Sequence, residues 1–396
     1  MPFGYLFTTG VMAVLVLFAL ASPQPSRSST ESRSFWLGFM VNELPFLALY
    51  LLAASTALAI GQGDIANPVG WIGLGLAVLA TAGLVVVVLR ALRTGAVVDE
   101  ALNAAGLPAR TPRRLPLRIF FWPFPVPHPG IERISNISYG DAGRANRLDV
   151  YRLRSHSGTG PTLVHLHGGA FRTGKKSRET RPLFHRLARR GWVCISANYR
   201  LRAPYTDPLV DVKKVIAWVR EHGPEYGADP NVVFVAGCSA GGHLASMAAL
   251  TADDASLQPG FEDVDTSVTA VVSLYGYYGP VGPERSSPMA YDGRGAPPFF
   301  VAHPDRDTFV TVEDARRFVE SLRKGSVNPV VYAELPGAQH VFDYFYSIRF
   351  EAVIDGIEAF ADDMLRPTSS PRRPPTAPDP VTESSGSPGR GRGERR

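Results

Sequence analysis

Long apolar runs crowd the first quarter of this 396-residue chain. Three of them stand out, and they cover Leu6–Ala21, Leu44–Ile60 and Val69–Leu89. The third holds 21 residues without a charged side chain, and about 20 apolar residues in a helix cross the roughly 30 Å hydrocarbon core of a bilayer. The middle run can recruit Phe35–Val41 upstream, although a polar Asn-Glu pair interrupts it. The pattern therefore predicts a membrane region with about three transmembrane helices in residues 1–90.

The first run also has an interpretation as a cleaved secretory signal. Ala19-Leu20-Ala21 matches an A-x-A cleavage site, but residues 1–10 contain no Lys or Arg, whereas a signal peptide begins with a positively charged region. We therefore expect an uncleaved helix, with cleavage as the alternative. For the other two runs the alternative is a buried helical hairpin of a soluble core.

Residues 131–366 show a different pattern, in which short β-rich runs alternate with helical stretches. This alternation is typical of a mostly parallel sheet covered by helices on both faces, so we expect an α/β domain of ordinary size. The expected strands are Arg147–Leu153, Thr162–His167, Val193–Tyr199, Val232–Ala236, Val268–Tyr275, Pro298–Ala302 and Val330–Glu334. The expected helices are Glu179–Arg190, Leu209–His222, Ala240–Leu250, Val312–Lys324 and Val341–Leu365.

Two segments without such periodicity flank this domain. Residues 91–130 mix arginines with prolines and aromatic residues, which predicts a linker at the membrane surface. Residues 367–396 hold seven prolines among Ser, Gly and Arg. Such a tail buries too little apolar surface to offset its ordering entropy, so we expect it to be disordered.

Charge and cysteine content narrow the function classes. The formal net charge is +5, but residues 1–130 carry 8 basic against 5 acidic residues and residues 367–396 carry 6 against 3, which leaves the central region near −1. A nucleic-acid partner requires basic residues clustered on the folded domain, so we expect none. The two cysteines, Cys194 and Cys238, offer no metal-ligand spacing. We predict neither a metal nor a cofactor.

The strongest chemical signal is Gly237-Cys238-Ser239-Ala240-Gly241, which follows an apolar strand and opens a helical stretch. In this strand–turn–helix context, G-x-S-x-G predicts a nucleophilic serine on a tight turn. Flanking glycines let strand and helix approach without Cβ clashes. Ser239 is therefore the candidate nucleophile.

A serine nucleophile needs a general base, and the base needs a carboxylate that orients it. Asp307 follows one expected strand and His340 follows the next, so the chain order is Ser, Asp, His, with each residue just past the end of a strand. We predict a catalytic triad of Ser239, Asp307 and His340. Asp305, two residues away in the same loop, is the rival acid.

Glycines after the strand Thr162–His167 predict an oxyanion hole. Gly168 and Gly169 expose backbone N–H donors there, and Ala240 adds one at the helix start. His165 and His167 form an H-x-H pair typical of zinc sites, but no third ligand follows at metal spacing, so we expect His167 to bond its own loop instead.

Three further features carry weaker signals. His243 and Cys238 are best interpreted as buried packing residues. The aromatic run Tyr275-Gly276-Tyr277-Tyr278 is equally consistent with a substrate pocket and with core packing. The segment between Tyr278 and Pro297 is too short for a large helical lid, which predicts an open site that prefers short to medium acyl chains.

These motifs resemble the α/β-hydrolase superfamily, in its esterase/lipase branch related to hormone-sensitive lipase and to bacterial carboxylesterases and feruloyl-esterase-like proteins. The resemblance covers about residues 131–366. Its carriers are His167-Gly168-Gly169, Asn198-Tyr199-Arg200-Leu201, Tyr226-Gly227-Ala228-Asp229-Pro230-Asn231, the stretch from Gly237 to Ala245, and the Asp307 and His340 loops. Cys238 stands where the family often has an acidic residue or His, and Pro304 stands where it usually has Gly. The membrane anchor looks similar to those of actinobacterial envelope lipases and eukaryotic prenylcysteine methylesterases.

Together these observations predict a membrane-anchored serine carboxylesterase or lipase that forms an acyl-enzyme on Ser239. An amidase or peptidase with the same machinery and a catalytically idle binding module are the alternatives. Arg27, Arg33, Arg90 and Arg93 lie on one side of the three expected helices, and no Lys or Arg lies on the other side. Because positive residues favour the cytoplasmic face, we expect the N-terminus outside and the catalytic domain in the cytoplasm.

Overall fold

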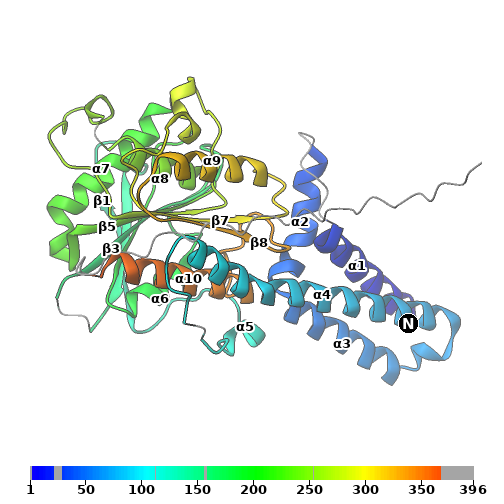
Figure 1. Cartoon of the computed structure of the whole chain (residues 1–396). Helices are drawn as coiled ribbons and strands as arrows, with labels where there is room; N and C mark the ends of the chain where they lie inside the picture. The colour runs from blue at the N-terminus through cyan, green and yellow to red at the C-terminus, as the bar shows by residue number, and fades with distance from the viewer. Residues whose placement is uncertain (1, 22–28, 112, 156–157, 253, 367–396) are drawn as a thin grey trace, which may run out of the picture.

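The computed structural model describes residues 2–21, 29–111, 113–155, 158–252 and 254–366. The predicted disordered tail, 367–396, and Arg27 lie outside these residues. Within them, an eight-stranded sheet flanked by helices is joined to a bundle of long N-terminal helices (Figure 1).

The sheet has the strand order β1-β2-β4-β3-β5-β6-β7-β8. Both pairs that involve β2 are antiparallel, and the pairs from β4 to β8 are parallel. The strands are β1 (Ile131–Ser138), β2 (Arg147–Leu153), β3 (Gly160–Leu166), β4 (Val193–Ala197), β5 (Ala228–Cys238), β6 (Ala270–Leu274), β7 (Phe299–Pro304) and β8 (Val330–Leu335). All seven predicted strands are present, and the mostly parallel α/β architecture is confirmed.

The prediction missed β1, the edge strand. Its alternation of apolar and polar residues is broken by a register shift between Ile134 and Ile137, where Asn136 takes a positive φ of 63°. Such a bulge inserts one residue and moves the following side chains to the other face. The period-2 signal is therefore lost over a strand that does pair with β2.

Helices cover both faces of the sheet and enclose two apolar cores. On one face lie α7 (Thr206–His222), α8 (Ala240–Leu250) and α9 (Val312–Gly325), and on the other lie α6 (Arg181–Ala188) and α10 (Ile348–Met364) (Figure 1). Short 3-10 helices occupy the connections: Gly223–Tyr226, Ala255–Leu257, Glu284–Ser286 and Pro288–Ala290. All five predicted helices are found, but Val341–Leu365 begins only at Ile348 because residues 341–347 form the loop after His340.

The N-terminal bundle consists of α1 (Pro2–Ala21), α3 (Pro45–Gly61) and α4 (Pro68–Ala104), with a 3-10 turn at Asp64–Ala66. Helices α1 and α4 are long and apolar enough to cross a membrane. The middle predicted span differs from expectation, since α2 (Ser29–Glu43) meets α3 at a bend of 89° rather than extending it. A third span is counted only if this bent pair of helices, α2 with α3, is one broken span.

Helix α4 continues well beyond the predicted end of its apolar run at Leu89. Residues 91–104, expected within the linker, form its C-terminal turns, and Val98, Ala101 and Leu102 are buried in the core beside α10. A Cβ at Gly356 of α10 would clash with the Val98 side chain, which shows how closely the helices approach. Among the described residues between α4 and β1, the one helix is α5 (Arg118–Phe121). The division into domains stays a prediction, but its first boundary falls within a continuous helix.

Candidate active site

The nucleophile turn lies at the centre of the sheet, between β5 and α8. Ser239 has φ 53° and ψ −116°, a conformation that is strained for any residue other than glycine. A Cβ at Gly237 would clash with the backbone of Gly241, and one at Gly241 would clash with the backbone of Leu166. The glycines of the motif are therefore required by the close approach of strand and helix.

The structure brings the three predicted triad residues together. His340 Nε2 lies 3.0 Å from Ser239 Oγ, and His340 Nδ1 lies 2.7 Å from Asp307 Oδ2. All three follow the carboxyl ends of parallel strands, β5, β7 and β8, which lie at the same edge of the sheet, with β6 between β5 and β7. This is the geometry in which an imidazole accepts a serine proton while a carboxylate holds its tautomer.

Asp307 is fixed by its own loop as well as by the histidine. Its Oδ1 accepts hydrogen bonds from the N–H groups of Phe309 and Val310, at 2.8 and 2.9 Å. Burial alone would raise the pKa of Asp307, but His340 and these bonds more than offset it and hold the pKa below its ordinary value. The rival Asp305 instead accepts the N–H of Gly337 at 2.8 Å. Its position braces the histidine loop and not the imidazole.

The oxyanion loop departs from expectation at one residue. The Gly168 N–H donates to Glu179 Oε2 at 2.6 Å, so this amide is already bonded and is not free to receive an oxyanion. In the part of the chain that the structure describes, the N–H groups of Gly169 and Ala240 donate to no protein acceptor. Leu166 pairs with Gly237, which sets the loop after β3 beside the nucleophile. Gly169 and Ala240 remain the predicted donors.

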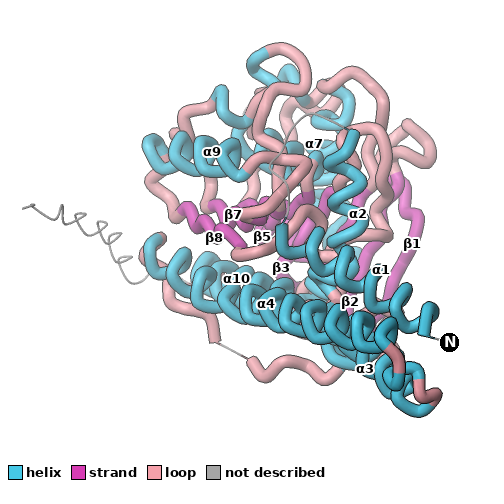
Figure 2. Tube along the Cα trace, turned by 90° about the vertical axis from the view of Figure 1, so that its right-hand side faces the viewer, coloured by secondary structure: helices cyan, strands magenta, loops and turns pink. Residues whose placement is uncertain are grey.

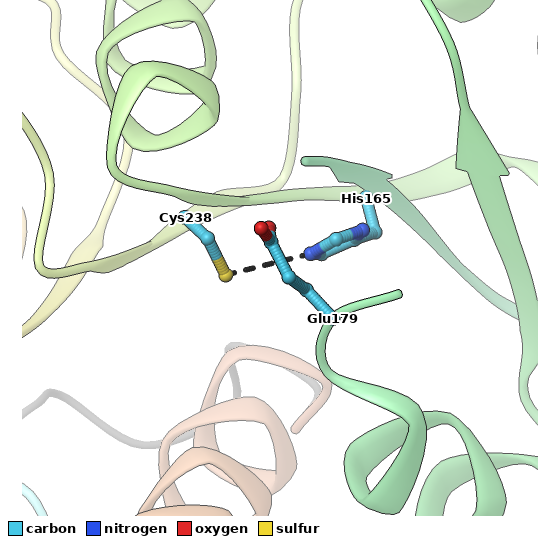
Figure 3. A group of neighbouring side chains, drawn as sticks. All are labelled: His165, Glu179 and Cys238. Atoms are coloured by element: carbon cyan, nitrogen blue, oxygen red, sulfur yellow. Dashed lines mark hydrogen bonds between the residues drawn. The ribbon is translucent and has the colours of Figure 1, made fainter. Parts of the chain in front are cut away.

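A buried polar cluster lies directly behind this loop. Figure 3 shows His165, Glu179 and Cys238 pointing toward one another, with Cys238 Sγ 3.5 Å from His165 Nε2. Asp343, equally buried, accepts a hydrogen bond from Thr180 at 2.6 Å and another from the Tyr275 hydroxyl. Burial, together with the negative charge of Asp343, raises the pKa of Glu179 to about 8. Two carboxyl groups thus share a buried site, which at neutral pH favours a proton on Glu179.

This cluster also contains side chains of the types that bind metal ions. Potential ligand atoms of His165, Glu179 and Cys238 lie within 4.8 Å of one another. The Thr180 hydroxyl lies among them, 2.9 Å from His165 Nε2 and 3.2 Å from Cys238 Sγ, so hydrogen bonds already account for the arrangement. The H-x-H pair does not form one site, because His167 bonds the Gly168 carbonyl at 2.7 Å and stacks on Tyr199. Absence of a metal stays a prediction.

The remaining sequence candidates occupy structural positions. His243 is buried between the Tyr205 hydroxyl, at 2.8 Å, and the Tyr277 carbonyl, at 3.0 Å. The aromatic run divides between both of its interpretations. Tyr275 lines the pocket at Ser239, whereas Tyr278 stacks on Phe318 in the core.

A pocket of about 350 Å³ opens over the triad. Its floor is formed by Ser239, His340 and the oxyanion loop, and one wall is formed by Phe35, Trp36 and Phe39 of α2. The segment between Tyr278 and Pro297 contributes no lining residue to this pocket, as the expectation of an open site assumed. What the expectation did not include is that a helix from the N-terminal region lines one wall of the site. Sequence patterns gave no link between α2 and the triad, because about 200 residues separate them.

Sequence reasoning also missed Glu179, Thr180 and Asp343. No motif contains them, and their importance arises only from burial beside the nucleophile. The position of Asp343, three residues after His340, is the one available signal. The role of Asp343 is visible only in the folded chain, where the loop after His340 brings it to Thr180 and Tyr275.

The comparisons with known proteins agree with this geometry. The BD-FAE family model matches residues 148–281. The probable carboxylic ester hydrolase LipM of Mycobacterium tuberculosis is 36% identical over 374 residues, which cover 83% of this chain and 85% of that protein. Esterase LipQ of the same organism is 38% identical over 273 residues, covering 59% of this chain and 65% of that protein.

Solved structures show the same fold. Esterase 2 of Thermogutta terrifontis, in its apo form, superposes with a TM-score of 0.53 at 24% identity, covering 61% of this chain and 97% of that chain. The match to LipM extends over most of both proteins and includes the esterase domain. The chain therefore belongs to the esterase branch of the α/β-hydrolase superfamily, and it is a serine hydrolase that acts on carboxylic esters.

Proposed function

We propose that the chain is a membrane-anchored carboxylesterase or lipase that forms an acyl-enzyme on Ser239. The observation that supports this most directly is the continuous chain of contacts from Ser239 Oγ through His340 to Asp307, at 3.0 and 2.7 Å. Ser239 and His340 line an apolar pocket. Beside the serine, the N–H groups of Gly169 and Ala240 donate to no acceptor among the described residues.

In the proposed mechanism, His340 Nε2 takes the hydroxyl proton as Ser239 Oγ attacks the ester carbonyl. The N–H groups of Gly169 and Ala240 stabilise the tetrahedral oxyanion, where each donor contributes about 2.7–4 kcal/mol in related hydrolases. His340 then protonates the leaving alcohol. Water, deprotonated by the same imidazole, releases the acid and restores the serine.

The anchor is proposed on the two long apolar helices, α1 and α4, with α3 as a third crossing of 17 residues. This arrangement would place the N-terminus and the turn before α4 together, away from the catalytic domain (Figure 1). Arg90 and Arg93 lie at the domain end of α4, so we place the domain in the cytoplasm. Protease added to intact cells should then spare the domain, and its loss beside an intact cytoplasmic marker would contradict this orientation.

Hydrolysis of a p-nitrophenyl ester by the purified full chain tests the chemistry. An initial burst of nitrophenol is expected from acylation, together with covalent labelling by a fluorophosphonate. Ser239→Ala should abolish labelling and lower kcat by about 10⁶-fold. Wild-type rates in the Ser239→Ala variant, or a folded wild-type chain that neither labels nor turns over, would reject the proposal.

A further inference from the structure

Helix α2 stands between the two parts of the molecule. It lies at the domain end of the bundle and turns through 89° into α3, so it runs across the direction of the bundle (Figure 1). If the bundle crosses the membrane, as the proposed function holds, α2 lies along the membrane surface. An interfacial helix of this kind keeps apolar side chains in the boundary between headgroups and acyl chains.

Residues 35–41, in the second half of α2, fit that position because they are apolar on two faces. Phe35 and Phe39 point inward and are 1% and 5% exposed. Trp36, Leu37 and Met40 are 67%, 40% and 47% exposed. In a soluble helix, the exposure of such large apolar side chains to water is unfavourable. At the membrane interface, aromatic and apolar side chains are common.

The inner face of α2 reaches the catalytic centre through ring contacts. The Phe35 ring lies 5.0 Å from that of Phe309, which lies 5.2 Å from the imidazole of His340. On the other side of the pocket, Phe39 contacts Tyr344 at 6.3 Å between ring centres. An apolar chain seated against these rings would bring its ester carbonyl to Ser239.

The same helix therefore contributes to the pocket and to the exposed apolar surface beside it. Trp36 belongs to both, since it lines the pocket while two-thirds of it remains exposed. Besides His340, the acidic and basic side chains that line this pocket are Arg178, exposed at the rim, and the buried Glu179. An acyl chain leaving a bilayer could enter along α2 without crossing water.

From this continuity we propose that the substrate is an ester lipid resident in the membrane, and that its long acyl chain enters the pocket along α2. The proposal rests on the proposed function and names its substrate class. It differs from the expectation of short to medium acyl chains, which was based on the short segment after Tyr278.

The test uses the full chain in phosphatidylcholine nanodiscs, with p-nitrophenyl palmitate dissolved in the bilayer and p-nitrophenyl acetate in water. The readout is the ratio of kcat/KM for palmitate to that for acetate. Trp36→Asp, which places a charge on the entry path, should lower this ratio by about tenfold or more. Trp36→Phe should preserve it, and so should Val327→Asp, which introduces the same charge at a site that is 95% exposed and does not line the pocket.

The outcomes separate the two proposals. A ratio that Trp36→Asp leaves unchanged, or a wild-type chain that prefers acetate in nanodiscs, would overturn the membrane-lipid inference while leaving the esterase assignment intact. Failure of the wild-type chain to hydrolyse either ester, with no fluorophosphonate labelling, would instead overturn the proposed function.

Discussion

Ser239, Asp307 and His340 come from three loops, and 101 and 33 residues separate the hydrogen-bonded pairs. Each loop is held by bonds that involve no catalytic atom. The histidine loop in particular is tied to the acid loop through the Gly337 N–H and Asp305. The two aspartates of the acid loop therefore have different tasks, although they lie two residues apart.

Substitution of each aspartate separates these tasks. Asp307→Asn should lower kcat by about 10⁴-fold, because an amide stabilises the wrong imidazole tautomer. Asp305→Asn retains an acceptor for Gly337 and should change kcat by less than about tenfold. Steady-state kinetics on one soluble ester, with circular dichroism as the folding control, measure both. A larger loss for Asp305→Asn would make the rival acid the catalytic one.

Glu179 leads to a prediction about stability and pH. Its carboxyl has an ordinary pKa of 4.5, and burial beside Asp343 raises it to about 8 in the folded chain. Between these values the folded chain holds a proton that the unfolded chain has released, so the free energy of unfolding should fall as pH rises from about 4.5 to about 8. The slope from one such group is at most about 1.4 kcal/mol per pH unit.

Glu179→Gln removes this ionisation and keeps a carbonyl that accepts the Gly168 N–H. Thermal unfolding of both proteins at pH 5, 6.5 and 8 should show a smaller loss of stability in the variant, which should exceed the wild type at pH 8. Parallel curves for the two proteins would show that Glu179 is already ionised in the folded chain.

At the scale of elements, α2 is held in place at its C-terminal end and near its middle. At its C-terminal end, the buried carboxylate of Glu43 pairs with Arg349 of α10 at 2.6 Å. Near its middle, α2 packs on α1 at Gly38, where a Cβ would lie 3.0 Å from the backbone of Phe18 and Ala19. The acid loop reaches the same region, since Arg306 donates to the Leu20 carbonyl at the end of α1.

Gly38→Val should force α2 away from α1. The overpacked contact is backbone and cannot move aside, so the expected cost is about 1–3 kcal/mol. Gly75→Val is the matched control, because Gly75 lies in the long helix α4 and a Cβ there meets no atom within 4 Å. Thermal unfolding in detergent should show a lower midpoint for Gly38→Val than for Gly75→Val. Equal midpoints would mean that α2 does not pack closely on α1.

At the scale of the whole molecule, α4 joins the bundle to the catalytic domain without a hinge. Its 37 residues span about 55 Å, and its last turns belong to the core beside α10 and β8 (Figure 2). The bundle itself closes around α1, whose Val16 packs against Gly83 of α4. Removal of α1 by cleavage after Ala21 would expose this seam, which supports the expectation that α1 is retained.

Truncation tests the shared core directly. A chain of residues 91–366 keeps Val98 and Leu102, whereas a chain of residues 131–366 exposes the apolar surface they cover. Burial of each such side chain contributes about 1.5–3 kcal/mol. The longer fragment should therefore unfold at a higher urea concentration than the shorter one. Equal stability of the two fragments would show that the catalytic domain begins at residue 131, as the sequence suggested.

Local patterns in the sequence were enough to predict most of the strands and the candidate triad. Parallel strands buried on both faces read as short apolar runs, so their positions followed from pattern alone. The tight turn at Ser239 requires glycines, and the order of Asp307 and His340 behind it follows from the order of the strands. Each of these features could be predicted from a short local pattern or from the order of such patterns along the chain.

Tertiary structure decided the features that depend on distant segments. The Gly168 amide is occupied only because Glu179 folds back onto it, and Thr180 fills the cluster of possible metal ligands only because Asp343 lies behind it. Likewise, the apolar sequence pattern of α2 is the same whether the helix crosses a membrane or lines a pocket. The bend before α3 and the packing of Phe35 on Phe309, which lies about 270 residues later in the sequence, place α2 at the pocket.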